Sequence, residues 1–346
     1  MHRCLQLAAL GGGRVAPNPM VGAVLVQGHR ILAEGWHHRS GAPHAEVECL
    51  RAFGDGPIPP DAILYVNLEP CAHHGKTPPC AELLVKRGVE HVVIGQRDPF
   101  PPVAGKGIAI LKAAGIQITE DVLHDECRWA QRRFLTSIES SRPYIILKWA
   151  RSADGYLDQH PRTGRGVQRI SGPATDTLVH RWRSEEQAIL VGSRTVLNDD
   201  PSLTVRHIEG RQPLRVVIDR KGITPANSAV YNYDAQTLLL TGRKRDDLPV
   251  EQHVVPLTVD PIMMLLNILH ERTIRSVLVE GGAELLGHFI ESGVWDEARV
   301  ITGTPQFGAG TPAPSMHQQP IRTARSGDDR IDLFTNEDRP SASWDW

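Results

Sequence analysis

Three residues in the N-terminal part of the chain have the types and the spacing of zinc ligands. They are His44, Cys71 and Cys80, one imidazole and two thiols, with eight residues between the two cysteines. Imidazole and thiolate are donors that Zn²⁺ prefers, and three protein ligands leave its fourth tetrahedral position open. An open position is typical of a catalytic site, because it holds a water molecule whose pKa falls to roughly 7.

Glu46 lies two residues after the first of these ligands. On a helix, residues two apart do not share a face, so Glu46 is placed to reach the water and not the metal. A carboxylate there can take a proton from the water and pass it to a departing amine. His-x-Glu followed by Pro-Cys is the signature of zinc deaminases. The eight-residue interval departs from that signature, in which two residues separate the cysteines.

A purely structural zinc site is the alternative interpretation of the same residues. It needs a fourth ligand, for which His73 and His74 are the nearby candidates. It also leaves Glu46 without a role, so the catalytic interpretation is preferred. The three other cysteines are interpreted as small buried apolar residues.

Short apolar runs alternate with helical patterns around these residues. The runs predict strands at Val21–Val26, Ala62–Val66 and Val92–Gly95. The helical patterns predict helices at Ala45–Phe53, Ala81–Gly88 and Ile108–Gly115. Strands that alternate with helices predict an α/β layer fold with mainly parallel strand pairing.

A polar stretch that ends in proline, Ile138–Pro143, predicts a junction between a domain at residues 1–140 and a second at 143–346. The second half is also α/β. Its predicted strands are Tyr144–Ala150, Ala188–Val191, Leu214–Asp219, Thr237–Thr241, Ser276–Val279 and Arg299–Thr302. Its predicted helices are Pro173–Ser184, Pro261–Arg272 and Ala283–Ser292. The polar tail from about residue 318 is predicted to be poorly ordered, apart from a strand at Arg330–Phe334.

Composition excludes several classes of protein. The chain has 346 residues, and 38 Lys and Arg against 40 Asp and Glu give a net charge of −2, which removes the bulk electrostatic basis for nucleic-acid binding. No run of 18 apolar residues predicts a membrane span, and the first residues lack the apolar core of a secretory signal. Five cysteines argue against a disulfide scaffold, so we expect a cytoplasmic protein.

Several motifs are similar to those of the riboflavin-biosynthesis deaminase–reductase family, across roughly residues 3–315. They are Glu69–Cys80, Pro17–Gly22, Val103–Gly107, Asn198–Arg206 and Val279–Gly282. The resemblance implies a cytidine-deaminase-like α/β/α domain followed by a dihydrofolate-reductase-like α/β domain. The first would hydrolyse the 2-amino group of 2,5-diamino-6-ribosylamino-4(3H)-pyrimidinone 5′-phosphate. The second would use NADPH to reduce the ribosyl chain, giving 5-amino-6-(5-phosphoribitylamino)uracil.

The resemblance also implies roles for residues of the first domain. The three ligands His44, Cys71 and Cys80 would hold Zn²⁺, with Glu46 as the proton shuttle. Substrate contacts would come from Asn18, His37, His73, Lys76 and Asp98. An amide such as Asn18 offers a donor and an acceptor to a base edge, and Lys76 would meet the phosphate as a point charge. Phe100 stands where many family members carry Asn.

In the second domain the resemblance implies two sets of contacts. The substrate set is Val167, Arg183, Leu203, Arg206 and Glu280. The cofactor set is Arg151, Arg169, Thr195, Asp199, Arg220, Gly281, Gly282 and Gly287. Asp199 is also the candidate catalytic proton donor, and Arg220 would face the 2′-phosphate of NADPH. Glycines at a helix start permit close approach of a phosphate without specifying it, and no Rossmann fingerprint is present.

Other functions stay open beside this one. A nucleobase or tRNA deaminase fused to an unrelated module is disfavoured by the balanced charge and by the cysteine interval. A non-catalytic, zinc-stabilised binding protein would be distinguished by the effect of Glu46→Ala. The reductase half could be degenerate, because Arg151, Arg169 and Arg220 depart from the commoner family residues. The resemblance implies a small-molecule pyrimidine ribose phosphate partner, no nucleic acid or membrane, and a homo-oligomer, with a dimer favoured.

Overall fold

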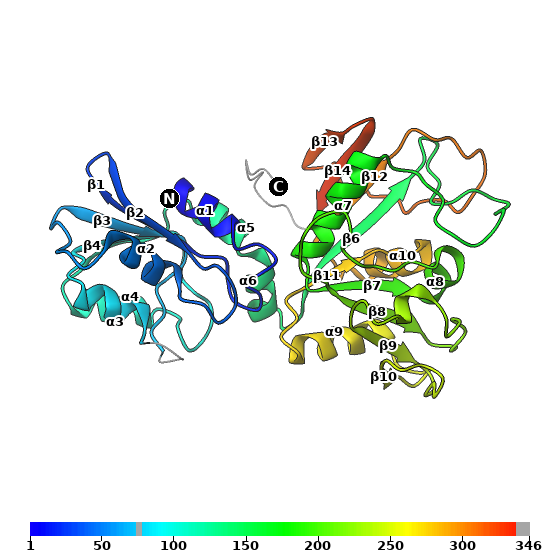
Figure 1. The fold of residues 1–346 in the computed structure, drawn as a ribbon, viewed down its shortest axis with the longest axis horizontal. Helices are drawn as coiled ribbons and strands as arrows, with labels where there is room; N and C mark the ends of the chain where they lie inside the picture. Colours follow the sequence, from blue (N-terminus) through cyan, green and yellow to red (C-terminus); the bar gives the residue numbers. More distant parts are fainter. Residues whose placement is uncertain (74–77, 337–346) are drawn as a thin grey trace. The chain divides into compact units, whose positions relative to one another are not determined.

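The chain folds into two compact units, and their boundary in the sequence lies between Ser141 and Arg142 (Figure 1). The computed structural model describes residues 1–73 and 78–336. The expected contacts of Lys76, and the alternative ligand His74, lie outside the described residues. Each unit has its own sheet and its own apolar core.

A sheet in the order β2-β1-β3-β4-β5 forms the centre of the first unit. Its strands are β1 (Gly22–Gln27), β2 (Arg30–Trp36), β3 (Ala62–Val66), β4 (His91–Ile94) and β5 (Gln117–Thr119). β4 is parallel to β3 and β5, but β1 is antiparallel to both β2 and β3. Mainly parallel pairing is therefore wrong for this unit. The reason is the tight turn after Gln27, where Gly28 has φ +56°, because so short a connection joins antiparallel strands only.

Helices cover both faces of this sheet. They are α1 (His2–Ala9), α2 (Ala45–Phe53), α3 (Cys80–Lys86), α4 (Lys106–Ala113), α5 (His124–Ala130) and α6 (Arg132–Glu139). Ala23 and Leu25 of β1 pack in one cluster with α2, α3 and α4, whereas Val24 packs with Cys4 and Leu7 of α1. The alternation of buried side chains along β1 thus yields the expected α/β/α layers.

The second unit contains a sheet in the order β10-β9-β8-β7-β11-β6-β12-β14-β13. Its strands are β6 (Tyr144–Arg151), β7 (Ala188–Gly192), β8 (Leu214–Asp219), β9 (Thr237–Thr241), β10 (Glu251–Val254), β11 (Ser276–Val279), β12 (Glu297–Thr302), β13 (Arg322–Ser326) and β14 (Asp329–Thr335). Every pair from β10 to β12 is parallel, as predicted, and β14 is antiparallel to β12 and β13. The parallel strands therefore share one carboxyl edge.

Two helical layers enclose this second sheet. The helices are α7 (Pro173–Glu185), α8 (Ser193–Asp199), a short 3₁₀ turn (Ala229–Tyr231), α9 (Pro261–Glu271) and α10 (Ala283–Ser292). Ile145 and Leu147 of β6 pack with α9 and α10, and Tyr144 and Ile146 pack with α7 and α8. Within the described ranges no helix is both long enough and apolar enough to cross a bilayer.

The tail is ordered where the sequence predicts poor order. Residues 322–335 form the β13–β14 hairpin, and β14 pairs with β12 along the sheet. Ile331, Leu333 and Phe334 are buried, so the hairpin contributes to the core. The prediction of poor order from residue 318 is thus wrong for this hairpin, although the strand at Arg330–Phe334 is present. The prediction failed because the polar residues of β13 are ordered by pairing with β14, and the composition of the segment gives no sign of this pairing.

Candidate metal centre and candidate reductase site

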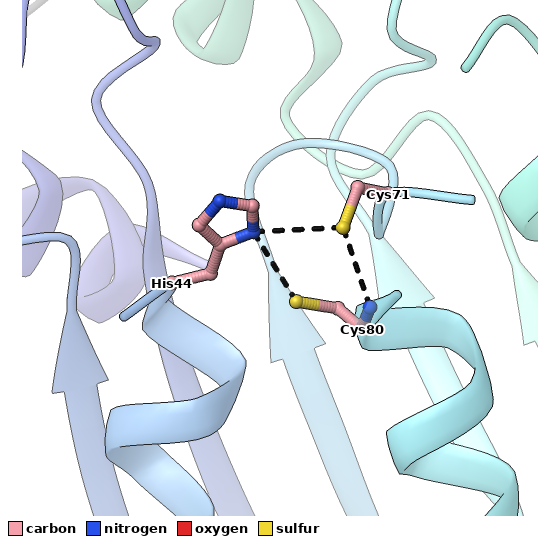
Figure 2. A group of neighbouring side chains, drawn as sticks. All are labelled: His44, Cys71 and Cys80. Carbon is pink, nitrogen blue, oxygen red and sulfur yellow. Dashed lines mark hydrogen bonds between the residues drawn. The ribbon is translucent and has the colours of Figure 1, made fainter. Parts of the chain in front are cut away.

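His44, Cys71 and Cys80 converge in the first unit (Figure 2). The Nδ1 atom of His44 lies 3.5 Å from the Sγ atom of Cys71 and 3.3 Å from that of Cys80. Nitrogen and sulfur ligands of one tetrahedral zinc ion would lie about 3.6 Å apart. The three side chains therefore fit a zinc ion in both donor chemistry and spacing.

The carboxyl edge of the sheet brings the ligands together. His44 is the residue immediately before α2, Cys80 is the first residue of α3, and Cys71 follows the end of β3 by a short loop. The backbone N–H of Cys80 donates to the Sγ atom of Cys71 at 3.3 Å. Contacts with Cys80 and His44 lower the pKa of the Cys71 thiol, whereas the contact with Cys71 and burial raise the pKa of the Cys80 thiol, so the pair favours one thiolate, at Cys71.

Glu46 lies in the first turn of α2, and only 3% of its surface is exposed. Burial raises the pKa of its carboxyl to about 7. A general acid–base group works best with a pKa near the working pH, because it can then both accept and release a proton. Its environment thus suits the proton-transfer role that the sequence predicts.

His73 does not join the three ligands in the described part of the chain. Its ring packs edge-on against Phe100, with the ring centroids 6.4 Å apart. The site among the described residues therefore has one imidazole and two thiols, the set that leaves a tetrahedral position open.

Asn18 and His37 form a pair beside the metal centre. His37 is buried, and its ring lies edge-on to that of His44 at 5.6 Å. Its Nδ1 lies 2.9 Å from the carbonyl oxygen of Pro43, and its Nε2 lies 3.2 Å from the amide nitrogen of Asn18. Burial lowers the pKa of His37. A neutral ring that donates from Nδ1 and accepts at Nε2 satisfies both contacts and orients the Asn18 amide.

Glu69 is a buried residue of the site region that the sequence analysis did not single out. Its carboxylate accepts N–H bonds from Asp98, Gly105 and Ile108 at 3.0–3.2 Å. It thereby holds the loop that carries Asp98. Asp98 in turn accepts the N–H of Phe100, and burial raises the pKa of Asp98 to about 6. The Glu-Pro-Cys motif places Glu69 next to a ligand, but only the fold brings its three donors together.

Asn67 is another residue of the site region that the sequence does not predict, and it holds the segment after Asn18. Its side chain accepts the N–H of Gly22 at 2.8 Å and donates to the carbonyl oxygen of Met20 at 3.0 Å. Gln131 contacts both backbone groups of Met20. These contacts fix the path of the chain that leads from Asn18 into β1.

Buried charges form the centre of the candidate reductase site. Arg183 donates to both oxygens of Glu280, at 2.7 and 2.8 Å, and Lys148 donates to the same carboxylate at 3.4 Å. Burial alone would raise the pKa of Glu280, but the positive charges of Arg183 and Lys148 hold it well below its usual value. Lys148, which the sequence analysis did not select, lies on β6 next to β11, the strand that precedes Glu280.

The other predicted substrate residues lie in two different environments. Arg206 is exposed, and its Nη1 atom donates to the hydroxyl of Thr204 at 3.0 Å. Leu203 is 2% exposed within a core cluster and has φ +54°, so only its backbone is available to a ligand. Val167 is 68% exposed.

The cofactor candidates gather at the carboxyl edge of the parallel strands, where α/β sheets bind ligands. Gly281 and Gly282 join β11 to α10, and a Cβ atom on Gly282 would lie 3.7 Å from the hydroxyl oxygen of Thr195. Thr195 is thus next to this glycine pair. Gly287 lies within α10, in its second turn, and so outside the loop.

Several predicted polar residues already have protein partners. Asp199 ends α8 and accepts from Arg162 at 2.8 Å, and burial raises its pKa. Three arginines that are predicted to contact the cofactor also have partners. Arg151 donates to Thr302, Arg169 donates to Asp176, and Arg220 donates to the carbonyl oxygen of Leu257.

Two family models match the chain. Residues 143–335 match the model of the RibD C-terminal domain. Residues 1–96 match the cytidine and deoxycytidylate deaminase zinc-binding region, and this range contains the candidate metal centre. The matches support the cytidine-deaminase-like and reductase-like fold classes.

Whole-chain relatives give the same pattern. Riboflavin biosynthesis protein RibD of Bacillus amyloliquefaciens is 39% identical, covering 91% of this chain and 86% of the relative. The Escherichia coli protein of the same name is 36% identical, covering 89% and 88%. A diaminohydroxyphosphoribosylaminopyrimidine deaminase/5-amino-6-(5-phosphoribosylamino)uracil reductase from Thermotoga maritima has a crystal structure with a TM-score of 0.87 and 35% identity, covering 97% of each chain.

Proposed function

The chain belongs to the RibD family and is a bifunctional deaminase and reductase of riboflavin biosynthesis, and on this premise we propose which of its residues carry each reaction. The substrate of the first reaction is 2,5-diamino-6-ribosylamino-4(3H)-pyrimidinone 5′-phosphate. The product of the second is 5-amino-6-(5-phosphoribitylamino)uracil. The observation that carries the assignment is the meeting of two thiols and one imidazole, with the buried Glu46 in electrostatic contact with all three.

In the deaminase unit, His44, Cys71 and Cys80 would hold Zn²⁺, which would supply an activated water molecule. Glu46 takes a proton from the attacking water and delivers it to the nitrogen that leaves as ammonia. Glu46 is buried beside the ligands, so its carboxyl can serve as a base in one step and as an acid in the next without exchange with bulk water.

The pyrimidine is oriented by the Asn18–His37 pair. The ring of His37 holds the Asn18 amide nitrogen at 3.2 Å, which leaves the amide oxygen to accept from the base. His73, Lys76 and Asp98 are assigned to the same pocket from the family motif. Asp98 is held there through the loop that Glu69 anchors.

In the reductase unit the two arginines have different tasks. Arg183 is committed to a bidentate pair with Glu280, so its role is to hold that carboxylate in place. Arg206 is exposed, and its guanidinium has further N–H groups beyond the one that donates to Thr204. We therefore propose that Arg206 binds the substrate phosphate. Glu280 would contact the substrate beside it, together with Leu203 through its backbone and with Val167.

NADPH supplies the hydride in this unit. Gly281 and Gly282, at the start of α10, permit close approach of its phosphates, and Thr195 adds a hydroxyl beside them. Arg220, directly after β8, is assigned to the 2′-phosphate. Asp199 is assigned to proton donation in its protonated form, which burial favours by raising its pKa, and Arg162 holds the group in place. The remaining cofactor contacts, proposed from the family pattern, are Arg151, Arg169 and Gly287.

The setting of the enzyme is also a proposal. We place it in the cytoplasm, which the five free thiols support, and we favour a homodimer by analogy with the family. Its partners are small molecules, not nucleic acid, because the chain has a net charge of −2.

A coupled assay tests the proposed function. The purified chain receives the diaminopyrimidine phosphate, with and without NADPH, and ammonia release and NADPH oxidation are followed. We expect ammonia in both mixtures, and NADPH oxidation only after deamination. Cytidine and tRNA serve as competing substrates. Ammonia from these alone would refute the assignment.

A further inference from the structure

A short segment that carries Arg206 belongs to no helix or strand, yet its backbone is held at each residue. Thr204–Arg206 lies between α8 and β8. The carbonyl oxygen of Thr204 accepts from Arg183 at 3.4 Å. Gln212 accepts the N–H of Val205 and donates to its carbonyl oxygen, both at 2.8 Å. Side chains thus replace the strand partner that an extended segment would otherwise need.

His180 completes this arrangement from α7. It is 4% exposed, and its Nδ1 accepts the backbone N–H of Arg206 at 3.0 Å. Burial, with the nearby charge of Arg183, lowers the pKa of His180 to about 4. The ring is therefore neutral near pH 7 and can accept at Nδ1. His207 stacks on this ring, with centroids 4.3 Å apart and planes 16° apart, which restricts its rotation.

One helix thus reaches both halves of the substrate site. His180 and Arg183 are three residues apart on α7 and so share a face. His180 fixes the backbone of Arg206, and Arg183 fixes Glu280. The distance between Arg206 and the carboxylate of Glu280 therefore depends on two side chains of the same helix, α7.

We propose that His180 is a positioning residue, with Gln212 as its counterpart, and that the two hold Arg206 ready for the 5′-phosphate of the reductase substrate. This inference rests on the proposed function, which assigns the phosphate to Arg206. A fixed backbone lowers the ordering entropy that an exposed arginine would otherwise lose on binding. The expected benefit is in substrate binding and not in the hydride step.

The test compares His180→Leu with His180→Asn. Leucine removes the acceptor, whereas the Oδ1 atom of asparagine can replace Nδ1. The substrates are 5-amino-6-(5-phosphoribosylamino)uracil and the same compound without its phosphate. For His180→Leu we expect KM for the phosphorylated substrate to rise about three- to tenfold, equivalent to one hydrogen bond, at unchanged kcat. The dephosphorylated substrate should show no change, and His180→Asn should restore the KM.

Ammonia release by the first unit and the dissociation constant of NADPH serve as controls for folding. Gln212→Ala should raise the same KM in the same selective way. An equal loss with both substrates, or an asparagine variant as impaired as the leucine variant, would overturn the inference.

Arg206→Ala separates the inference from the function on which it rests. If Arg206→Ala raises the KM of the phosphorylated substrate and His180→Leu does not, only the positioning role fails. If Arg206→Ala leaves that KM unchanged, the phosphate assignment fails and the inference fails with it.

Discussion

Glu46 is the residue on which the deamination chemistry depends. Replacing it by glutamine keeps the shape of the side chain but removes its proton transfer. For Glu46→Gln we expect at least a hundredfold lower rate of ammonia release. The zinc content should be unchanged, because the three ligands are other residues. Glu48→Gln, two residues along α2, is the matched control and should keep full activity. Loss of zinc from Glu46→Gln would instead identify the residue as a ligand.

The buried pair of Arg183 and Glu280 predicts a measurable stability effect. Glu280→Gln leaves the positive charges of Arg183 and Lys148 without their carboxylate. We expect the second unit to lose about 3 kcal/mol of unfolding free energy, a typical value for breaking a buried ion pair. Denaturant unfolding measures the loss. Glu284→Gln, at an exposed ion pair, should change stability by less than about 0.5 kcal/mol.

The same carboxylate predicts a pH dependence. The folded-state pKa of Glu280 is lowered, so its stabilising contribution is fully present above the unfolded pKa of about 4.3. The contribution is lost as pH falls towards the folded-state value. The stability difference between wild type and Glu280→Gln should therefore be constant from pH 7 to 5 and shrink below about pH 4. A difference that stays constant down to pH 3 would show that the carboxylate has a normal pKa.

Among single residues, the sequence predicts those with distinctive side-chain chemistry. It does not predict those whose side chains hydrogen-bond to backbone groups. The spacing of His44, Cys71 and Cys80 predicts a cluster that the structure brings together. Glu69 and His180 could not be selected in this way, because their hydrogen bonds go to N–H groups that are distant in sequence. Any residue except proline supplies such an N–H, so no motif records the contact.

Helix α4 can pack against the segment that carries Cys71 only because Gly107 has no side chain. A Cβ atom at Gly107, in the first turn of α4, would lie 1.9 Å from the carbonyl oxygen of Pro70. For Gly107→Ala, α4 must move away from the segment that carries the ligand. We expect about 3 kcal/mol lower stability and weaker zinc retention, measured by thermal unfolding and by competition with a chelator. Gly56→Ala is the control, because a Cβ there meets no atom within 4 Å. Equal behaviour of the two variants would show that α4 adapts without loss.

The strands with correctly predicted bounds are mostly buried on both faces, and the bounds of the helices α2 and α10 are also those predicted. β3, β8, β9 and β11 have the predicted bounds, since continuous apolar runs leave few alternatives. The sequence does not predict β2, because this strand mixes charged residues such as Arg30 and Glu34 with apolar ones. The sequence does not predict α1 either, although its apolar face packs on β1.

For the whole molecule, the separate location of the two sites predicts independent responses to metal removal. The candidate ligands all belong to the first unit, and the candidate NADPH contacts to the second. A strong chelator should abolish ammonia release while leaving NADPH oxidation intact when the deaminated substrate is supplied. Added Zn²⁺ should restore deamination. Parallel loss of both activities would show that the second unit depends on the metal as well.

The β13–β14 hairpin has a consequence for shortened versions of the chain. Truncation near residue 318 would strip β12 of its neighbour and leave a row of unsatisfied peptide groups along an open sheet edge. The same cut would remove Ile331, Leu333 and Phe334 from the apolar core. Such a protein would be prone to edge-to-edge aggregation, even though the last of the short sequence motifs, Val279–Gly282, lies well before the cut.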